Sequence, residues 1–210
     1  MTLLWLIVAL AGCSRDTAGD KDPVTGGDNL SAPTEDLAAE DVDGLLLLQA
    51  TESRGLAMTF AKQLKGELQA AMAEGGPELA IDVCHQRAPK IAAALAEMSG
   101  WQVYRTSLKP RRRAPDAWEQ RVLKDFDLRA AGGEEISGIE HYAVVDTGDG
   151  TTVFRYMKAL GTEPLCLNCH GESISAPVRE RIDGLYPDDQ ARGYRAGQIR
   201  GAISITQPPG

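Results

Sequence analysis

The sequence predicts an α+β fold in which long N-terminal helices flank an antiparallel sheet. Apolar residues recur at helical spacing between residues 56 and 95, which indicates amphipathic helices. Residues 139–146 and 151–160 instead alternate around Gly148-Asp149-Gly150, the pattern of a β-hairpin. Because the helices precede the strands and do not alternate with them, we expect one compact α+β domain over residues 44–210.

The N-terminal half predicts two amphipathic helices in succession. The first helix ends at Gly75-Gly76, because glycine is favoured where a helix stops. Pro77 suits the first turn of a helix, so the second helix begins there. The two apolar stripes are Leu56, Phe60, Leu64, Leu68 and Ala71, then Ile81, Cys84, Ala88, Ile91 and Leu95.

The second half of the chain predicts shorter elements around the hairpin. Residues 101–108 have the composition of a strand, and residues 110–115 form a basic loop. Asp116 and Glu119 have the spacing of a capping box, so a helix begins there. The remaining predicted elements are a short helix over residues 176–185 and a final strand over residues 201–206.

The N-terminus has the pattern of an export signal. Residues 3–10 are apolar, too few to span a bilayer but enough for the core of a signal peptide. The run ends in Leu-Ala-Gly-Cys, which resembles the lipobox of bacterial lipoproteins and predicts a signal peptide over residues 1–12 and lipidation of Cys13. A plain secretory signal with an incidental Cys13 is the alternative. We therefore expect a lipid-anchored protein on the periplasmic side of a bacterial membrane, and Ser14 favours the outer membrane.

Residues 13–43 predict a disordered, acidic tether between the lipidated cysteine and the domain. Asp, Gly, Thr, Ser and Pro dominate this segment, which cannot bury enough apolar surface to offset ordering. Residues 14–43 hold two basic and nine acidic side chains, which accounts for −7 of the formal net charge of −8. The domain itself is nearly neutral, so we expect no nucleic-acid partner, and contact with a membrane only through the lipid.

Residues 166–170 read Cys-Leu-Asn-Cys-His, the attachment signature of a c-type haem. Two thiols at this spacing can each add to a vinyl group of one porphyrin, and the histidine that follows lies over the iron. We therefore expect one covalent haem c, attached at Cys166 and Cys169, with His170 as the proximal iron ligand. A zinc site or a redox dithiol is the alternative, but zinc normally takes four Cys or His ligands and the chain has no second paired knuckle.

Spacing alone does not identify the second axial ligand of the iron. With Cys13 assigned to lipid and two cysteines to haem, Cys84 is the remaining thiol. Cys84 lies near the centre of its helical stripe, whereas His85 lies toward the flank of the same helix. His141 alternates with apolar residues on a predicted strand. The candidates are Cys84, His85, His141, Met58, Met72, Met98 and Met157.

Several segments together resemble a family of single-haem c-type domains with a PAS-like sheet. They are residues 80–92 (Ala-Ile-Asp-Val-Cys-His-Gln-Arg-Ala-Pro-Lys-Ile-Ala), 104–109 (Tyr-Arg-Thr-Ser-Leu-Lys) and 166–171 (Cys-Leu-Asn-Cys-His-Gly), followed by Tyr186-Pro187, Gly193-Tyr194 and Arg200-Gly201-Ala202. The resemblance implies a PAS-like antiparallel sheet, Cys84 as the distal iron ligand opposite His170, and a sensory role. The chain departs from the family pattern at His85, a competing ligand, and at Arg111-Arg112-Arg113, which replaces an Arg-Asn-Pro run.

Basic residues near these segments are candidates to pair with the haem propionates. Arg105 and Lys109 belong to the second segment, and the arginine triplet over residues 111–113 follows closely. Guanidinium and ammonium groups form charge-assisted hydrogen bonds with carboxylates. For the triplet, a solvated basic loop is an equal alternative.

These observations favour a redox-responsive haem sensor over an enzyme. A thiolate from Cys84 would stabilise ferric iron, so reduction should weaken its bond to iron and shift the second helix. The alternative is a simple periplasmic electron-transfer cytochrome, since the chain shows no kinase or DNA-binding segment. A gas-binding or peroxidase-like haem protein is disfavoured, because that chemistry needs an open iron position. Either favoured role requires a redox partner protein, which no motif identifies.

Overall fold

The computed structural model describes residues 39–208. The predicted signal peptide, Cys13 and most of the predicted tether lie outside these residues. Where the tether is described, the structure corrects the prediction: residues 39–43 are helical, because helix α1 (Ala39–Ser99) begins at Ala39. Leu46 and Ala50 anchor this stretch on the core, and an anchored helix extends easily because its nucleus has already formed.

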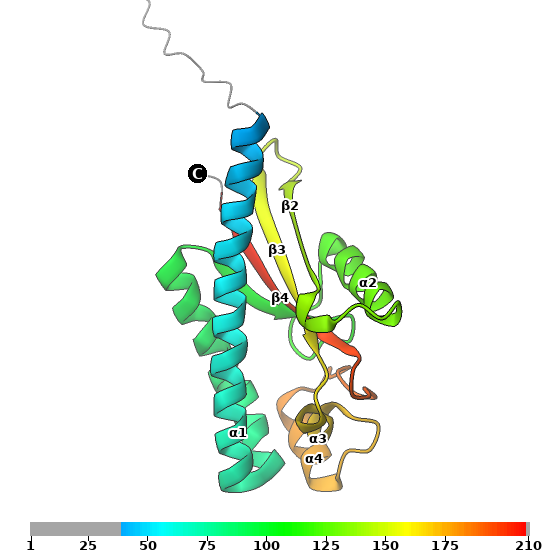
Figure 1. Ribbon diagram of the computed structural model, residues 1–210. Helices are drawn as coiled ribbons and strands as arrows, with labels where there is room; N and C mark the ends of the chain where they lie inside the picture. The colour runs from blue at the N-terminus through cyan, green and yellow to red at the C-terminus, as the bar shows by residue number, and fades with distance from the viewer. Residues whose placement is uncertain (1–38, 209–210) are drawn as a thin grey trace, which may run out of the picture. The chain divides into compact units, whose positions relative to one another are not determined.

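Helix α1 is a helical hairpin that reverses at Gly76. The first arm runs to Gly75 and the second arm from Pro77 to Ser99 (Figure 1). Between them, Gly76 has a φ of 71° and a ψ of −163°, far from helical values. Glycine adopts such a conformation at little cost because it has no Cβ. The reversal confirms the predicted helix end at Gly75-Gly76 and the predicted helix start at Pro77.

The two arms of α1 pack together through the predicted apolar stripes. In one buried cluster, Phe60 and Leu64 of the first arm join Ile91 and Leu95 of the second arm. Arg87 of the second arm also donates two hydrogen bonds to the Glu67 carboxylate of the first. Buried apolar contact and a bidentate ion pair therefore hold the arms as one layer.

A four-stranded antiparallel sheet forms the centre of the domain, which confirms the α+β prediction. The strand order is β1–β4–β3–β2, where β1 is Gln102–Thr106, β2 is Glu140–Asp146, β3 is Thr152–Gly161 and β4 is Ile199–Gln207. The predicted hairpin consists of β2 and β3, with Val145 opposite Val153 near the turn. The last strand of the chain lies between the first and the third, so the C-terminal segment completes the core.

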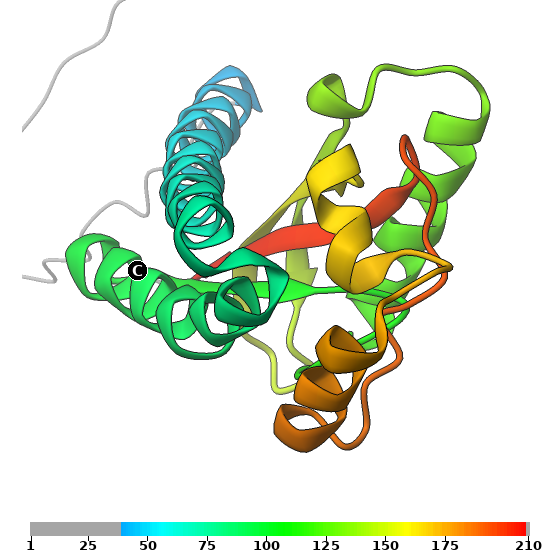
Figure 2. The same ribbon diagram turned by 90° about the horizontal axis from the view of Figure 1, so that it is seen from below.

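Helices cover both faces of the sheet (Figure 2). Successive strand residues point to opposite faces: Tyr156 packs in the cluster with α1, whereas Met157 packs with α2 (Ala117–Ala131). Helix α2 begins with the predicted capping box. The Asp116 carboxylate accepts from the Glu119 N–H, and the Glu119 carboxylate accepts from the Asp116 N–H.

The Cys-x-x-Cys-His segment lies beyond the end of β3, beside the reversal of α1 (Figure 1). It spans a 3-10 helix, η2 (Pro164–Cys166), and the short helix α3 (Leu167–His170), and α4 (Ala176–Leu185) follows. Val178 and Ile182 of α4 pack with Ile81 of the second arm. A further 3-10 helix, η1 (Ile136–Gly138), precedes β2. Within residues 39–208, no helix has the length and apolar character needed to cross a membrane.

Replacing Gly76 by alanine should destabilise the domain by about 1 to 3 kcal/mol, because the reversal holds this residue at positive φ. Gly66→Ala is the matched control: Gly66 is exposed in the first arm, with open space where a Cβ would lie. Alanine there should stabilise by about 0.5 to 1 kcal/mol, since it is the better helix former. Denaturant unfolding followed by circular dichroism measures both. Equal effects of the two substitutions would contradict this account of the reversal.

Candidate cofactor-binding site

The Cys-x-x-Cys-His segment turns all three of its functional side chains toward one cavity of about 170 Å³. Cys166, Cys169 and His170 line this cavity together. Burial, with a further contribution from the nearby Cys84, raises the pKa of Cys169 to about 11, so its sulfur is a neutral thiol at neutral pH. Gly171 closes the segment tightly: a Cβ on it would lie 2.5 Å from the Leu167 carbonyl oxygen. The local turn therefore requires glycine directly after His170.

Cys84 reaches the same cavity from the second arm of α1. Together with His170, it also lines a smaller adjoining cavity of about 90 Å³. Cys84 lies on α1 and His170 on α3, and strands β1, β2 and β3 lie between these two helices in the sequence. Their meeting at one cavity is what a pair of axial ligands requires.

The other candidate ligands lie elsewhere, with one exception. His85 lines neither cavity: Arg112 donates to its carbonyl oxygen over 2.9 Å and lies 3.0 Å from its Nδ1. His141 lies on β2, with its ring 5.7 Å from the Trp118 ring of α2. Met72 lines the larger cavity. Of the other methionines, Met58 and Met98 are exposed and Met157 is buried beneath α2.

Much of the lining of the larger cavity is apolar. Apolar lining suits the faces of a porphyrin. The side chains come from both arms of α1, from the end of β3 and from η2. They are Phe60, Ala61, Leu64, Leu68, Met72, Ala80, Ile81, Leu160 and Leu165.

Charged side chains also line this space, and Lys65 and Glu163, which pair with each other, do so at the larger cavity. Arg105, Arg111 and Arg200 line both cavities, and Arg112 and Arg113 also line the smaller one. No acidic side chain lines the smaller cavity. A space lined by both apolar side chains and guanidinium groups matches a haem, whose macrocycle is apolar and whose two propionates are anionic.

The surroundings of His170 fix its ring and keep its imidazole neutral, as a metal ligand requires. Its Nδ1 lies 2.7 Å from the Ala191 carbonyl oxygen, and its own carbonyl accepts a hydrogen bond from the Tyr194 N–H. Burial, with smaller contributions from Arg200 and Arg111, holds the pKa of His170 well below its ordinary value. The imidazole is therefore neutral. A proton on Nδ1, donated to Ala191, leaves the Nε2 lone pair for a metal.

A buried ion pair fixes the loop that carries Ala191. Arg111 donates to the Asp189 carboxylate over 2.7 Å, and the two side chains are only 9% and 1% exposed. Arg111 also donates to the Cys169 carbonyl oxygen, and Asp189 accepts from the Ala191 N–H. The pair thus links the Cys-x-x-Cys-His segment to the loop whose Ala191 carbonyl contacts His170. No sequence signal marked Asp189, because its partner lies far away in the chain.

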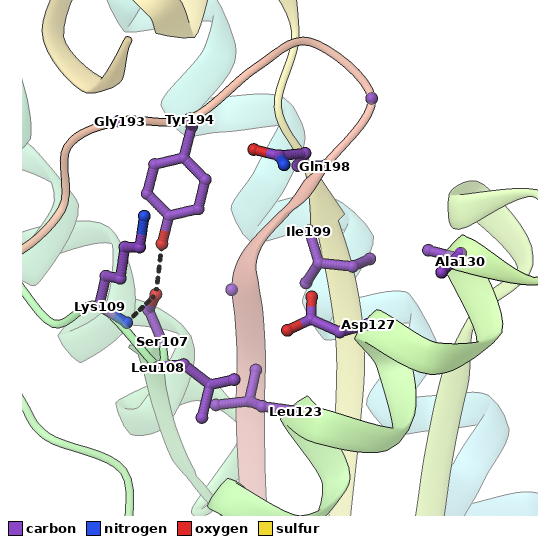
Figure 3. A pocket seen from close by; sticks show the side chains of 13 residues that line it. Ser107, Leu108, Lys109, Leu123, Asp127, Ala130, Gly193, Tyr194, Gln198 and Ile199 are labelled. Carbon is purple, nitrogen blue, oxygen red and sulfur yellow. Dashed lines mark hydrogen bonds between the residues drawn. The ribbon is translucent and has the colours of Figure 1, made fainter. Parts of the chain in front are cut away.

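Lys109, which the sequence grouped with Arg105, lies at a different cavity. This cavity, of about 460 Å³, lies between α2 and the loop that leads into β4 (Figure 3). Lys109 Nζ donates to the Arg192 carbonyl oxygen and lies 4.8 Å from the centre of the Tyr194 ring. Strand β1 ends at Thr106, and beyond it Lys109 lines this cavity, whereas Arg105, still within β1, lines the two cavities at which Cys84 and His170 meet.

An α+β domain with a Cys-x-x-Cys-His motif facing a cavity defines a class of cofactor-binding proteins. The model of the Tll0287-like family matches residues 35–208, and the chain belongs to that family. It is also similar to a solved structure, described as the crystal structure of the cyanobacterial haem protein Tll0287. The sequence identity is 26% and the TM-score 0.52, over 75% of this chain and 95% of that chain. These matches confirm the resemblance to a haem-protein family. No curated protein matches the chain significantly.

Replacing Asp189 by asparagine should lower the free energy of unfolding by about 3 to 5 kcal/mol near neutral pH, because Arg111 would stay buried without its anion. Asp188→Asn, at the exposed neighbouring position, is the matched control and should have little effect. Denaturant unfolding of both variants measures the difference.

The same pair predicts how this difference depends on pH. Burial alone would raise the pKa of Asp189, but hydrogen bonds from Arg111 and Arg192 outweigh it and the pKa is lowered. Such a carboxylate stabilises the fold above its unfolded pKa, and that contribution is lost as the pH falls through the folded pKa. The difference in free energy of unfolding between wild type and Asp189→Asn should therefore become smaller below about pH 4. A difference that becomes larger below about pH 4 would contradict the account of the Arg111–Asp189 ion pair.

Proposed function

We propose that the chain carries one haem c, joined by thioether bonds to Cys166 and Cys169, with His170 and Cys84 as the axial iron ligands. The observation that carries the proposal is the meeting of these four side chains at one cavity. Haem at this position would supply one-electron redox chemistry. Support also comes from the family match and from the haem protein with which the chain shares its fold.

The protein's own residues have distinct tasks in this proposal. The Ala191 carbonyl orients His170, and the second arm of α1 presents Cys84. The apolar side chains of the cavity would exclude water from the porphyrin faces, while the arginines that line it would bind the two carboxylates. The four antiparallel strands would serve as the PAS-like support on which these elements are assembled.

We further propose that the haem acts as a redox-responsive sensor module. A cysteine thiolate favours ferric iron, so its bond to iron should weaken on reduction. Cys84 lies on the second arm of α1, close to Ile81, whose side chain packs against α4. Loss of the iron–sulfur bond would therefore act directly on the packing between α1 and α4, which is the kind of two-state element that a switch requires.

A simple electron-transfer cytochrome is the second candidate, and the position of His85 favours it. Arg112 and the Tyr186 ring, 5.2 Å from the imidazole centre, hold His85 away from the cavity. With His85 held by these contacts, only Met72 among the other candidate ligands lines the cavity, so Cys84 would stay on the iron in both oxidation states unless Met72 replaced it. Gas binding or peroxidase-like chemistry is less favoured, because two axial ligands leave no open iron position.

Attachment outside the cytoplasm completes the proposal. The signal peptide over residues 1–12 and the lipidated Cys13 would place the domain at the periplasmic side of a membrane, with the outer membrane favoured by Ser14. The acidic segment after Cys13 would hold the domain away from the lipid surface. The expected partner is a redox protein in the same compartment.

Protein produced together with c-type haem maturation machinery should gain the mass of one haem and keep it under denaturing conditions, because thioether bonds do not dissociate. The Cys166→Ala, Cys169→Ala double variant should lose the added mass, whereas Cys84→Ala should keep it, since an axial ligand is not an attachment residue. Intact-protein mass spectrometry measures all three. A colourless wild-type protein without added mass would exclude haem c.

Electron paramagnetic resonance of the ferric protein should show a low-spin thiolate signal that disappears in Cys84→Ala. His85→Ala, which changes the neighbouring residue outside the cavity, should leave the signal unchanged. A ferric wild-type signal without thiolate character, which changes in His85→Ala and not in Cys84→Ala, would assign the ligand to His85. Carbon monoxide binding to the ferrous protein then separates the two roles: binding accompanied by loss of Cys84 supports a sensor, and resistance to carbon monoxide supports an electron carrier.

A further inference from the structure

Arg200 is a buried arginine without a carboxylate partner. The residue is only 7% exposed, and it lines both cavities at which Cys84 and His170 meet. Within residues 39–208 it forms no ion pair with an acidic side chain. Its Nη1 reaches Ser107 Oγ at 3.2 Å, but its Nε has no hydrogen-bond partner. A buried guanidinium in this state is costly unless an anion completes its surroundings.

A β-bulge aims Arg200 at the cavity. Leu160 and Gly161 are consecutive on β3, yet their partners on β4 are Gly201 and Ile199, so Arg200 is the extra residue between them. Bulges of this kind redirect a side chain out of the regular alternation and are common beside functional sites. Gly201 follows at a φ of 152°, and a Cβ on it would lie 2.3 Å from the Thr106 carbonyl oxygen. The backbone is therefore built to hold Arg200 in this position.

The side chains that contact Arg200 are uncharged. Ser107 Oγ donates to the Arg200 carbonyl oxygen over 2.9 Å and lies 3.1 Å from the Tyr194 hydroxyl (Figure 3). The Tyr194 ring centre is 5.1 Å from the guanidinium carbon. These contacts orient the guanidinium but leave its charge uncompensated. Burial, together with nearby Arg105, lowers the pKa of Arg200 to about 10, so the group still carries its charge at neutral pH.

The other arginines that line the cavities differ from Arg200 in charge pairing or in burial. Arg111 pairs with Asp189, and Arg113 pairs with Glu119. Arg105 and Arg112 form no ion pair within residues 39–208, but Arg105 is half-buried and Arg112 is exposed, whereas Arg200 is buried. A ligand carboxylate is the group that a planar guanidinium fork binds best.

We infer that Arg200 binds a carboxylate of the haem, and that it does so in place of Lys109, which the sequence had suggested. The inference rests on the proposed function, since haem supplies the carboxylate. Because Tyr194 supports Arg200 and also donates its N–H to the His170 carbonyl, this contact would link the carboxylate edge of the haem to the proximal ligand.

The test compares Arg200→Gln, Arg200→Lys and Lys109→Gln as full-length holoproteins whose haem carboxyl groups carry a ¹³C label. Lys109→Gln is the matched control, because it removes the same charge beside the same Tyr194 ring but at a different cavity. Mass spectrometry first establishes that haem is attached in each variant, so that a failure of the proposed function is recognised separately. Oxidised-minus-reduced infrared spectra then report the labelled carboxylate bands, and redox titration reports the potential.

Arg200→Gln should shift a labelled carboxylate band and lower the reduction potential. Ferric haem carries one more positive charge than ferrous haem, so removing a nearby positive charge favours the ferric state. Arg200→Lys should shift the band less, and Lys109→Gln should leave it unchanged. Unchanged labelled bands in Arg200→Gln with attached haem would overturn the inference. If Arg200→Gln does not fold, nuclear dipolar coupling between the labelled carboxyl carbons and ¹⁵N-labelled arginine is measured in wild type instead. The inference predicts a coupling that is lost in Arg200→Lys. A coupling that persists in Arg200→Lys would overturn the inference.

Discussion

The packing of the second arm of α1 against α4 is the contact on which the rest of the site depends. Ile81 of this arm joins Val178, Ile182 and Tyr186 in a buried cluster. The contact places Cys84, three residues after Ile81 on the same helix, at the cavity that His170 lines from α3. Without the reversal at Gly76, the second arm would point away from α4, and the thiol and the imidazole would never meet. Backbone conformation at one glycine thus determines whether Cys84 and His170 can line one cavity.

The second constraint on the site is the positive charge of the arginines that line its cavities. Asp189 pairs with Arg111 and Glu119 with Arg113. Arg105, Arg112 and Arg200 form no ion pair within residues 39–208, and Arg200 is the most buried of these three. Buried ion pairs stabilise a fold only when they are complete, so a carboxylate brought by the cofactor would stabilise the folded chain as well as hold the cofactor. Binding and folding would then be coupled through this one guanidinium.

Local sequence signals predicted much of this fold, because each acts over a few residues. Gly75-Gly76 followed by Pro77 marked the reversal, and Asp116 with Glu119 marked the start of α2. The alternating hairpin strands required an antiparallel sheet. The Cys-x-x-Cys-His spacing placed three site residues in one short turn, and the helical stripe placed Cys84 on a buried face.

The parts that sequence reasoning missed depend on contacts between distant segments. Arg200 points at the cavity because of a register shift between β3 and β4, which no local pattern reveals. Lys109 was grouped with Arg105 by proximity in sequence, yet the chain turns after Thr106 and carries Lys109 to another cavity. His85 is held away from the site by Arg112, a residue of a different loop. Each of these placements requires the tertiary structure.

X-ray absorption at the iron edge of the ferric holoprotein tests the central claim most directly, namely that His170 and Cys84 approach one iron from opposite segments of the chain. The account predicts a first coordination shell of one sulfur atom and five nitrogen atoms, four of them from the porphyrin. A shell of nitrogen atoms alone, with no sulfur at bonding distance, would contradict it.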